Sequence, residues 1–187
     1  MADTEFGATL WGRAWLRTVE RTDGPPRSNL PKARSLARNH KVELALSGSP
    51  TATVRDGSST STVDLNLAPW TEKEAGAAAD VLSAYRPDPS GDLPDGLLAQ
   101  LTEADVSVTP DTPDETATCT CRARKRPCAH ILAAIYALVL QIDERPVTAV
   151  EVRVGGETPC GSSSTDPDWI ALEEIDAATF FDSPHAP

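Results

Sequence analysis

Three cysteines and one histidine lie within twelve consecutive residues and follow the spacing C-x-C-x6-C-x-H: Cys119, Cys121, Cys128 and His130. Three thiolates and one imidazole form a complete tetrahedral ligand set for zinc and leave no coordination position for water or substrate. A closed site of this kind stabilises a fold, so it indicates a binding module rather than an enzyme. No other feature of the sequence constrains the fold as strongly.

The spacing also predicts which elements carry the four ligands. Residues two apart on a strand point to the same face, so Cys119 and Cys121 can reach one metal from the end of a strand that contains Thr116 to Thr118. Residues two apart on an α-helix diverge by about 200°, so Cys128 should lie just before a helix, with His130 in or before its first turn. Apolar residues at helical spacing predict that helix, and Arg145-Pro146 ends it: Ile131, Leu132, Ile135, Leu138, Val139 and Ile142.

This pattern resembles the SWIM zinc finger, a C-x-C-x(n)-C-x-H family, most strongly over residues 115–145. A looser likeness to bacterial SWIM proteins covers residues 10–86, which begin with a segment rich in Trp and Arg, Leu10 to Trp15. The resemblance implies one structural zinc on the four ligands and binding of DNA or of proteins, and some members of the family act beside helicase-like ATPases. The chain differs from the family in being short and acidic, with a Gly/Ser-rich linker and a tail.

Other interpretations of the cysteines have less support. Disulfides would require an oxidising compartment, and the N-terminal residues do not resemble a signal peptide. An iron–sulfur cluster would usually need a fourth cysteine in the group, and the C-x-x-C motif of thioredoxin-like proteins does not occur. Cys160 stands apart from the other three, and we interpret it as an incidental loop thiol.

Local patterns predict an α+β fold in which a small antiparallel sheet with helices precedes the zinc module and an acidic C-terminal tail. We divide the chain into an N-terminal region (1–110), the zinc finger with a following helix and strand (111–154), and a linker with the tail (155–187). Helices are expected at 10–21, from the capping box at Thr71 to residue 86, and at 93–104, and residues 25–33 look irregular. Strands are expected at 41–47, 51–55, 60–67, 106–108 and 147–154.

Charge is distributed unevenly along the 187 residues, whose net charge is −11. A chain this acidic repels phosphate at long range, so DNA binding would need a local basic patch. One such patch lies in the loop between the two ligand pairs (122–127, the knuckle loop) and comprises Arg122, Arg124, Lys125 and Arg126. These cations could equally offset the thiolates. A second basic set fits a solvated face better: Arg13, Arg17, Arg21, Arg27, Lys32, Arg34, Arg38 and Lys41.

The last 33 residues contain seven Asp or Glu and no Lys or Arg. A Gly/Ser-rich linker precedes a segment in which large apolar residues alternate with acidic ones, a composition that suits insertion of a helix into a partner's groove. The predicted partner-binding residues are Trp169, Leu172, Ile175 and Phe181. The alternative is that this tail folds back onto its own domain.

The leading hypothesis is a non-enzymatic, cytoplasmic, zinc-binding accessory subunit. It would bind a protein partner, for which the resemblance implies a helicase-like ATPase, and would assist DNA engagement. One alternative is a direct DNA-binding protein that uses the knuckle loop, and another is an enzyme whose site assembles only in three dimensions. No known catalytic motif occurs in the chain, and no apolar run is long enough to span a membrane.

Overall fold

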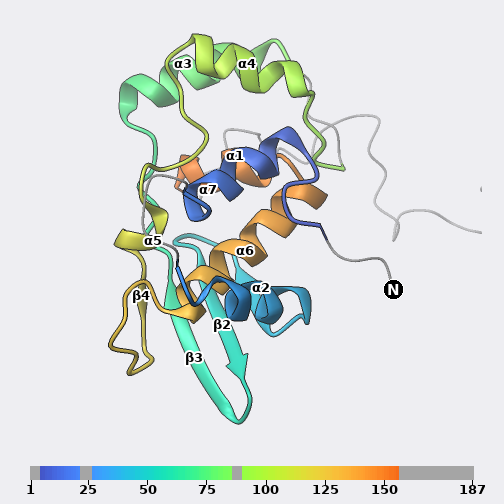
Figure 1. Cartoon of the computed structure of the whole chain (residues 1–187). Helices are drawn as coiled ribbons and strands as arrows, with labels where there is room; N and C mark the ends of the chain where they lie inside the picture. Colours follow the sequence, from blue (N-terminus) through green and yellow to red (C-terminus); the bar gives the residue numbers. More distant parts are fainter. Residues whose placement is uncertain (1–4, 22–26, 86–89, 156–187) are drawn as a thin grey trace, which may run out of the picture.

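A computed structural model of the chain describes residues 5–21, 27–85 and 90–155 (Figure 1). Over these residues the fold is a four-stranded antiparallel sheet with helices, as the sequence predicts. The helices are α1 (Leu10–Val19), α2 (Leu30–Arg38), α3 (Glu72–Ser83), α4 (Asp95–Glu103), α5 (Pro113–Thr116), α6 (Ala129–Glu144) and α7 (Thr148–Val154). The strands are β1 (Val42–Ala45), β2 (Thr51–Asp56), β3 (Ser59–Asp64) and β4 (Thr118–Cys119).

The longest helix, α6, forms the centre of the fold (Figure 1). It contacts α1, α2 and α7 and also touches every strand of the sheet. Most of its side chains are buried on all sides, including Ile131, Tyr136 and Ile142, a pattern that is typical of a core helix. The helix that follows the predicted metal ligands therefore lies at the centre of the hydrophobic core.

The strands follow one another in the order β1-β2-β3-β4. The first three form a meander, as predicted, in which Val54 pairs with Val42 on one side and with Ser61 on the other. The short β4 adds to the free edge of β3, where Cys119 lies opposite Val63. Backbone pairing of β4 with β3 thus attaches the first ligand pair to the N-terminal meander.

The helix α1 begins at an N-cap residue, Thr9, whose hydroxyl accepts a hydrogen bond from the Gly12 amide at 3.0 Å. Trp11 and Trp15 are one turn apart and fully buried, so both belong to the hydrophobic core. The prediction that residues 25–33 are irregular is wrong for its last residues, because α2 begins at Leu30. Proline is tolerated in the first turn of a helix, and the buried residues Ala33, Leu36 and Ala37 hold α2 against α6.

Two strand predictions are wrong. Residues 147–154 form α7, whose buried positions include Thr148, Ala149, Val152 and Arg153, a helical and not an alternating pattern. Valines at alternate positions of this segment imitate the pattern of a strand. The segment is nevertheless helical, because a helix buries its apolar side chains against α6. Residues 106–108 are not a strand either; Val106 and Val108 are buried, and the Trp70 indole N–H donates to the Ser107 carbonyl at 2.7 Å.

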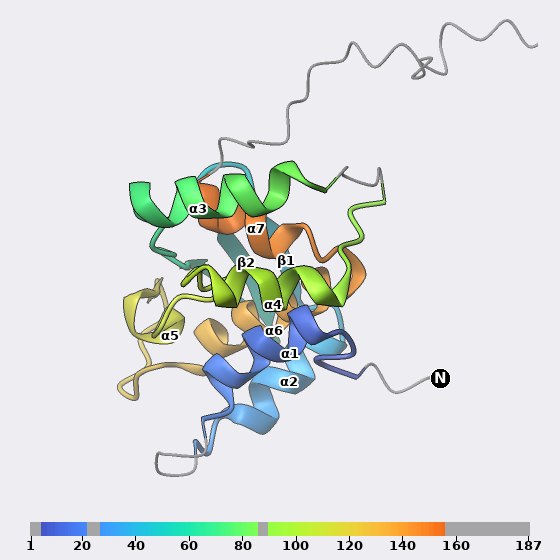
Figure 2. The same cartoon turned by 90° about the horizontal axis from the view of Figure 1, so that it is seen from above.

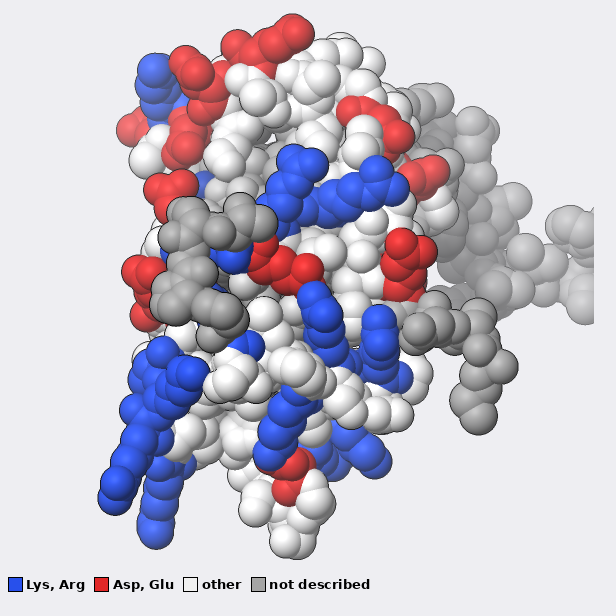
Figure 3. Space-filling view, in the orientation of Figure 1, with Lys and Arg blue, Asp and Glu red and all other residues white. Residues whose placement is uncertain are grey.

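The helices α3 and α4 lie side by side (Figure 2), at the top of the molecule in Figure 1. The predicted capping box is present at the start of α3: Thr71 accepts from the Glu74 amide, and the Glu74 carboxylate accepts from the Thr71 amide. Acidic residues on these helices make this end of the molecule negative (Figure 3). Among the described residues no helix is both long and apolar enough to cross a membrane.

Candidate metal centre

The metal-ligand atoms of Cys119, Cys121, Cys128 and His130 converge between β4 and the start of α6. Cys119 ends β4 and Cys121 follows it, while Cys128 is the N-cap residue of α6 and His130 lies in its first turn. This arrangement confirms the predicted positions of the ligands at a strand end and a helix start. The strand is shorter than predicted, because Thr116 ends α5 and only Thr118 and Cys119 form β4. All four ligand atoms lie within 4.8 Å of one another.

The residues fit zinc. Tetrahedral zinc with sulfur at about 2.3 Å and nitrogen at about 2.0 Å sets its ligand atoms roughly 3.5 to 3.8 Å apart. The Cys119 Sγ lies 3.8 Å from the His130 Nδ1, and none of the three cysteines is in a disulfide. The Cys128 side chain is buried and His130 is largely so, so the four side chains are positioned to hold one zinc ion in a closed site.

The three thiols lie close together, and this proximity changes the pKa values of Cys119 and Cys121. Burial raises the pKa of Cys119 to about 12, and the neighbouring thiols act in the same direction. Burial also acts to raise the pKa of Cys121, but hydrogen bonds from the Ala123 amide and from His130 outweigh it and lower the pKa to about 7. Three crowded thiols cannot all ionise readily by themselves. A divalent cation removes this obstacle because its charge stabilises the thiolates.

Two residues from the N-terminal region adjoin the centre. The His130 Nε2 lies 3.2 Å from the Asp56 Oδ2 at the end of β2, and the Lys32 Nζ lies 2.6 Å from the same oxygen. Lys32 first, and then His130, lower the pKa of the Asp56 carboxyl. Sequence reasoning missed Asp56, because it is 74 residues from His130 and an isolated Asp-Gly pair indicates only a turn.

The four cations of the knuckle loop are exposed: Arg122, Arg124, Lys125 and Arg126. They contribute to a positive area at the lower left of Figure 3, next to β4. Within the described part of the chain, none of the four forms an ion pair with an acidic residue. The loop is tied to the segment before α2, because the Lys125 Nζ donates to the Ser28 hydroxyl at 3.0 Å and the Asn29 Nδ2 donates to the Pro127 carbonyl at 2.7 Å.

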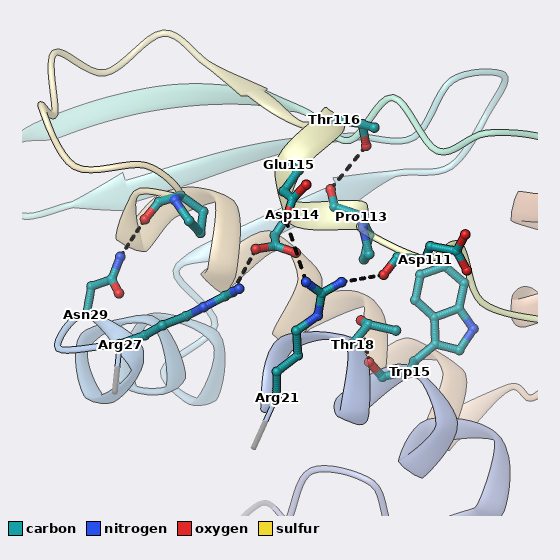
Figure 4. Close-up of polar contacts among 11 residues, drawn as sticks. Trp15, Thr18, Arg21, Arg27, Asn29, Asp111, Pro113, Asp114, Glu115 and Thr116 are labelled. Carbon is teal, nitrogen blue, oxygen red and sulfur yellow. Dashed lines mark hydrogen bonds and ion pairs between the residues drawn. The ribbon is translucent and has the colours of Figure 1, made fainter. Parts of the chain in front are cut away.

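The second basic set has mainly structural partners. Arg27 pairs at 2.7 Å with the Asp114 carboxylate, whose side chain is fully buried, and Arg21 reaches both the Asp111 carbonyl and Glu115 (Figure 4). Arg34 pairs with Glu20, and Lys32 pairs with Asp56. The contacts of Arg27 and Arg21 attach the segments beside α1 and α2 to residues 111–115, which lead into the zinc finger. Arg34 instead joins α2 to the end of α1, and Lys32 joins α2 to β2.

A cavity of about 510 Å³ opens beside the finger and is lined by Arg27, Asp114, Glu115, Ala117, Thr118, Cys119, Arg126, Pro127 and Ile131. Its most buried polar pair, Arg27 with Asp114, is already an ion pair. The predicted partner-binding residues Trp169, Leu172, Ile175 and Phe181, like Cys160, lie outside the described residues.

Comparison with known proteins agrees with the geometry. Residues 106–139 match the model of the SWIM zinc finger family, and this match includes all four ligands, the knuckle loop and the first part of α6. Comparisons with curated proteins and with solved structures gave no match. The family match and the convergence of the four ligand atoms show that residues 106–139 of the chain form a SWIM zinc finger.

Proposed function

We propose that this chain is a non-enzymatic interaction subunit in which the zinc finger presents the knuckle loop to the phosphate backbone of DNA. A protein partner would hold the DNA, and the family resemblance suggests a helicase-like ATPase. SWIM zinc fingers commonly mediate interactions with proteins or DNA. The observation that carries the proposal is the exposure of four cations on one short loop, without an acidic partner among the described residues.

The loop is suited to binding because its ends are fixed. The ligands Cys121 and Cys128 border it, so one metal ion would hold both ends. Hydrogen bonds from Asn29 to Pro127 and from Lys125 to Ser28 restrain it further. A restrained loop loses little conformational freedom when it binds, and binding is stronger for that reason.

The net charge of −11 opposes DNA binding, but the arrangement of the charges reduces this effect. Among the described residues, acidic side chains gather over α3 and α4, at the opposite end from the knuckle loop (Figure 3). At physiological ionic strength, exposed charges are screened over about 8 Å. The local positive potential then dominates at the loop, and the acidic end favours an orientation with the loop toward the phosphates.

The cavity beside the finger supports the non-enzymatic part of the proposal. A catalytic cavity usually brings together polar groups that are free to act on a substrate. Here the buried carboxylate of Asp114 holds Arg27, and Cys119 belongs to the metal centre. These groups stabilise the attachment of α5 to the N-terminal segment.

The test is the salt dependence of DNA binding by the zinc-loaded full chain. Each cation that contacts a phosphate adds about one unit to the slope of log affinity against log salt concentration. The double variant Arg122→Ala/Arg124→Ala should reduce this slope by about two. The double variant Arg17→Ala/Lys73→Ala removes the same charge from exposed positions outside the loop and should leave the slope nearly unchanged.

Two results would reject DNA contact through the loop: no DNA binding by the wild-type chain at low salt, or equal effects of the two double variants. Affinity capture from the native cell, with and without nuclease, tests the protein partner separately. A partner that remains after nuclease treatment contacts the protein directly.

A further inference from the structure

The two ring nitrogens of His130 have different neighbours. Nδ1 faces the metal centre, 3.8 Å from the Cys119 Sγ. Nε2 points the other way, to the Asp56 Oδ2 at 3.2 Å. A neutral imidazole carries one N–H and one free lone pair, so a carboxylate beside Nε2 favours the tautomer with its proton on Nε2. That tautomer leaves the Nδ1 lone pair free on the side of the three sulfurs.

Asp56 is itself held in place. It ends β2 at the turn into β3, and the Lys32 Nζ from α2 lies 2.6 Å from the same carboxylate oxygen that faces His130. The Asp56 side chain is 28% exposed and the His130 side chain 13%. The contact between them is therefore more shielded from water than a surface ion pair such as Arg55 with Glu43, whose side chains are 59% and 68% exposed.

We propose that Asp56 is a positioning residue of the zinc centre: it accepts the Nε2–H of His130 and thereby directs Nδ1 to the metal, while Lys32 holds Asp56 in place. The four ligands belong to the family pattern, whereas Asp56 and Lys32 lie outside the matched residues 106–139. Partners of this kind orient a histidine ligand and make it more basic. The proposal is independent of DNA binding.

This arrangement links the metal centre to two N-terminal elements besides the β3–β4 pairing. Lys32 comes from α2, Asp56 from β2, and His130 from the first turn of α6. Zinc binding would then favour the packed arrangement of α2, the β2–β3 turn and α6. The same contacts would reduce the loss of zinc by holding the imidazole in its ligating orientation.

The first test measures zinc affinity of the full chain by competition with a chromogenic chelator. Loss of a carboxylate that orients a metal-bound histidine typically weakens metal binding about 10- to 100-fold, and Asp56→Ala should do so. Asp56→Asn keeps an acceptor oxygen without the charge and should have a smaller effect. Lys32→Ala should weaken zinc binding by about two- to fivefold. Glu43→Gln, which removes an exposed carboxylate from the same sheet, should change it by less than about twofold.

The second test needs no substitution. Nitrogen NMR of the zinc-loaded wild-type chain should show His130 coordinated through Nδ1, with an Nε2–H that exchanges slowly with water. In Asp56→Asn this proton should exchange faster. Coordination through Nε2 in the wild type would overturn the proposal, and so would zinc affinity of folded Asp56→Ala within about threefold of wild type. Far-UV circular dichroism distinguishes a folding defect from a loss of affinity, and the wild-type NMR result remains decisive if Asp56→Ala does not fold.

Discussion

The carboxylate of Asp143, in the last turn of α6, lies directly against the backbone of Gly12 in α1. The carboxylate accepts hydrogen bonds from the Gly7 amide at 2.7 Å and from the Thr9 amide at 2.9 Å. A Cβ atom at Gly12 would lie only 2.0 Å from the Asp143 Oδ1. The helix whose first turn carries a zinc ligand thus fixes the start of α1 at its other end, and this contact requires a glycine.

We therefore expect Gly12→Ala to destabilise the protein. The added methyl group must displace Asp143 and its hydrogen bonds, and overpacking of this kind typically costs about 1–3 kcal/mol. Gly76→Ala is the matched control, because Gly76 lies in α3 with no atom within 4 Å of an added Cβ. Alanine is the better helix former, so this control should stabilise the protein by up to about 1 kcal/mol. Urea denaturation of both variants measures the difference, and a neutral or stabilising Gly12→Ala would contradict the predicted clash.

Zinc should be present at one ion per chain. Cys121→Ser or His130→Ala should release it and unfold at least residues 115–145, because structural zinc of this type contributes on the order of 10 kcal/mol to local folding. The effect should spread beyond the finger, since β4 pairs with β3 and α6 contacts α1 and α2. Metal analysis and hydrogen exchange at the Thr120 amide, which donates to the Thr62 carbonyl, measure the two effects.

Cys160→Ser is the control for the zinc prediction, because Cys160 lies apart from the four ligands in the sequence. This variant should keep its zinc and its hydrogen-exchange protection. Full zinc retention by both ligand variants, or the absence of zinc from the purified wild-type chain, would show the prediction to be wrong.

The ligand positions could be predicted because they depend on local geometry. Two residues that are two positions apart point to the same face on a strand but to different faces on a helix. The sequence therefore indicates a strand end for Cys119 and Cys121 and a helix start for His130. The meander was also predictable, because turn residues separate its alternating strands. In these cases, local patterns and the tertiary packing favour the same structure.

Where tertiary packing determines the secondary structure, local sequence patterns predict it poorly. The valines of residues 147–154 alternate like a strand, but the packing of α7 against α6 makes them helical. The helix α2 has few apolar residues and a proline, and it is stabilised by packing on α6 more than by its own propensity. Asp56 could not be predicted either, since its contact with His130 exists only after the β2–β3 turn has packed beside α6.

The buried ion pair between Arg27 and Asp114 should contribute far more to stability than the exposed one between Arg55 and Glu43. Asp114 has a fully buried side chain, and its Oδ1 has no hydrogen-bond partner among the described residues. Arg27→Ala would leave this carboxylate without its cation, and loss of one partner from a buried pair costs about 3 kcal/mol or more. Arg55→Ala breaks a surface pair and should cost less than about 1 kcal/mol. Denaturant unfolding of the two variants gives the comparison, and equal costs would show that Arg27 is dispensable for the attachment of α5.

The tail provides a last prediction, which follows from its sequence. Its apolar residues Trp169, Leu172, Ile175 and Phe181 are expected to bind a groove on a partner, with the acidic residues facing a basic rim. A chain lacking residues 166–187 should therefore keep its zinc and its thermal midpoint but capture the partner less well. The fluorescence of Trp169, obtained as the difference between the spectra of the wild-type chain and of Trp169→Phe, should shift to the blue only when the partner is added. A marked fall in the thermal midpoint on deletion would instead indicate that the tail packs on its own domain.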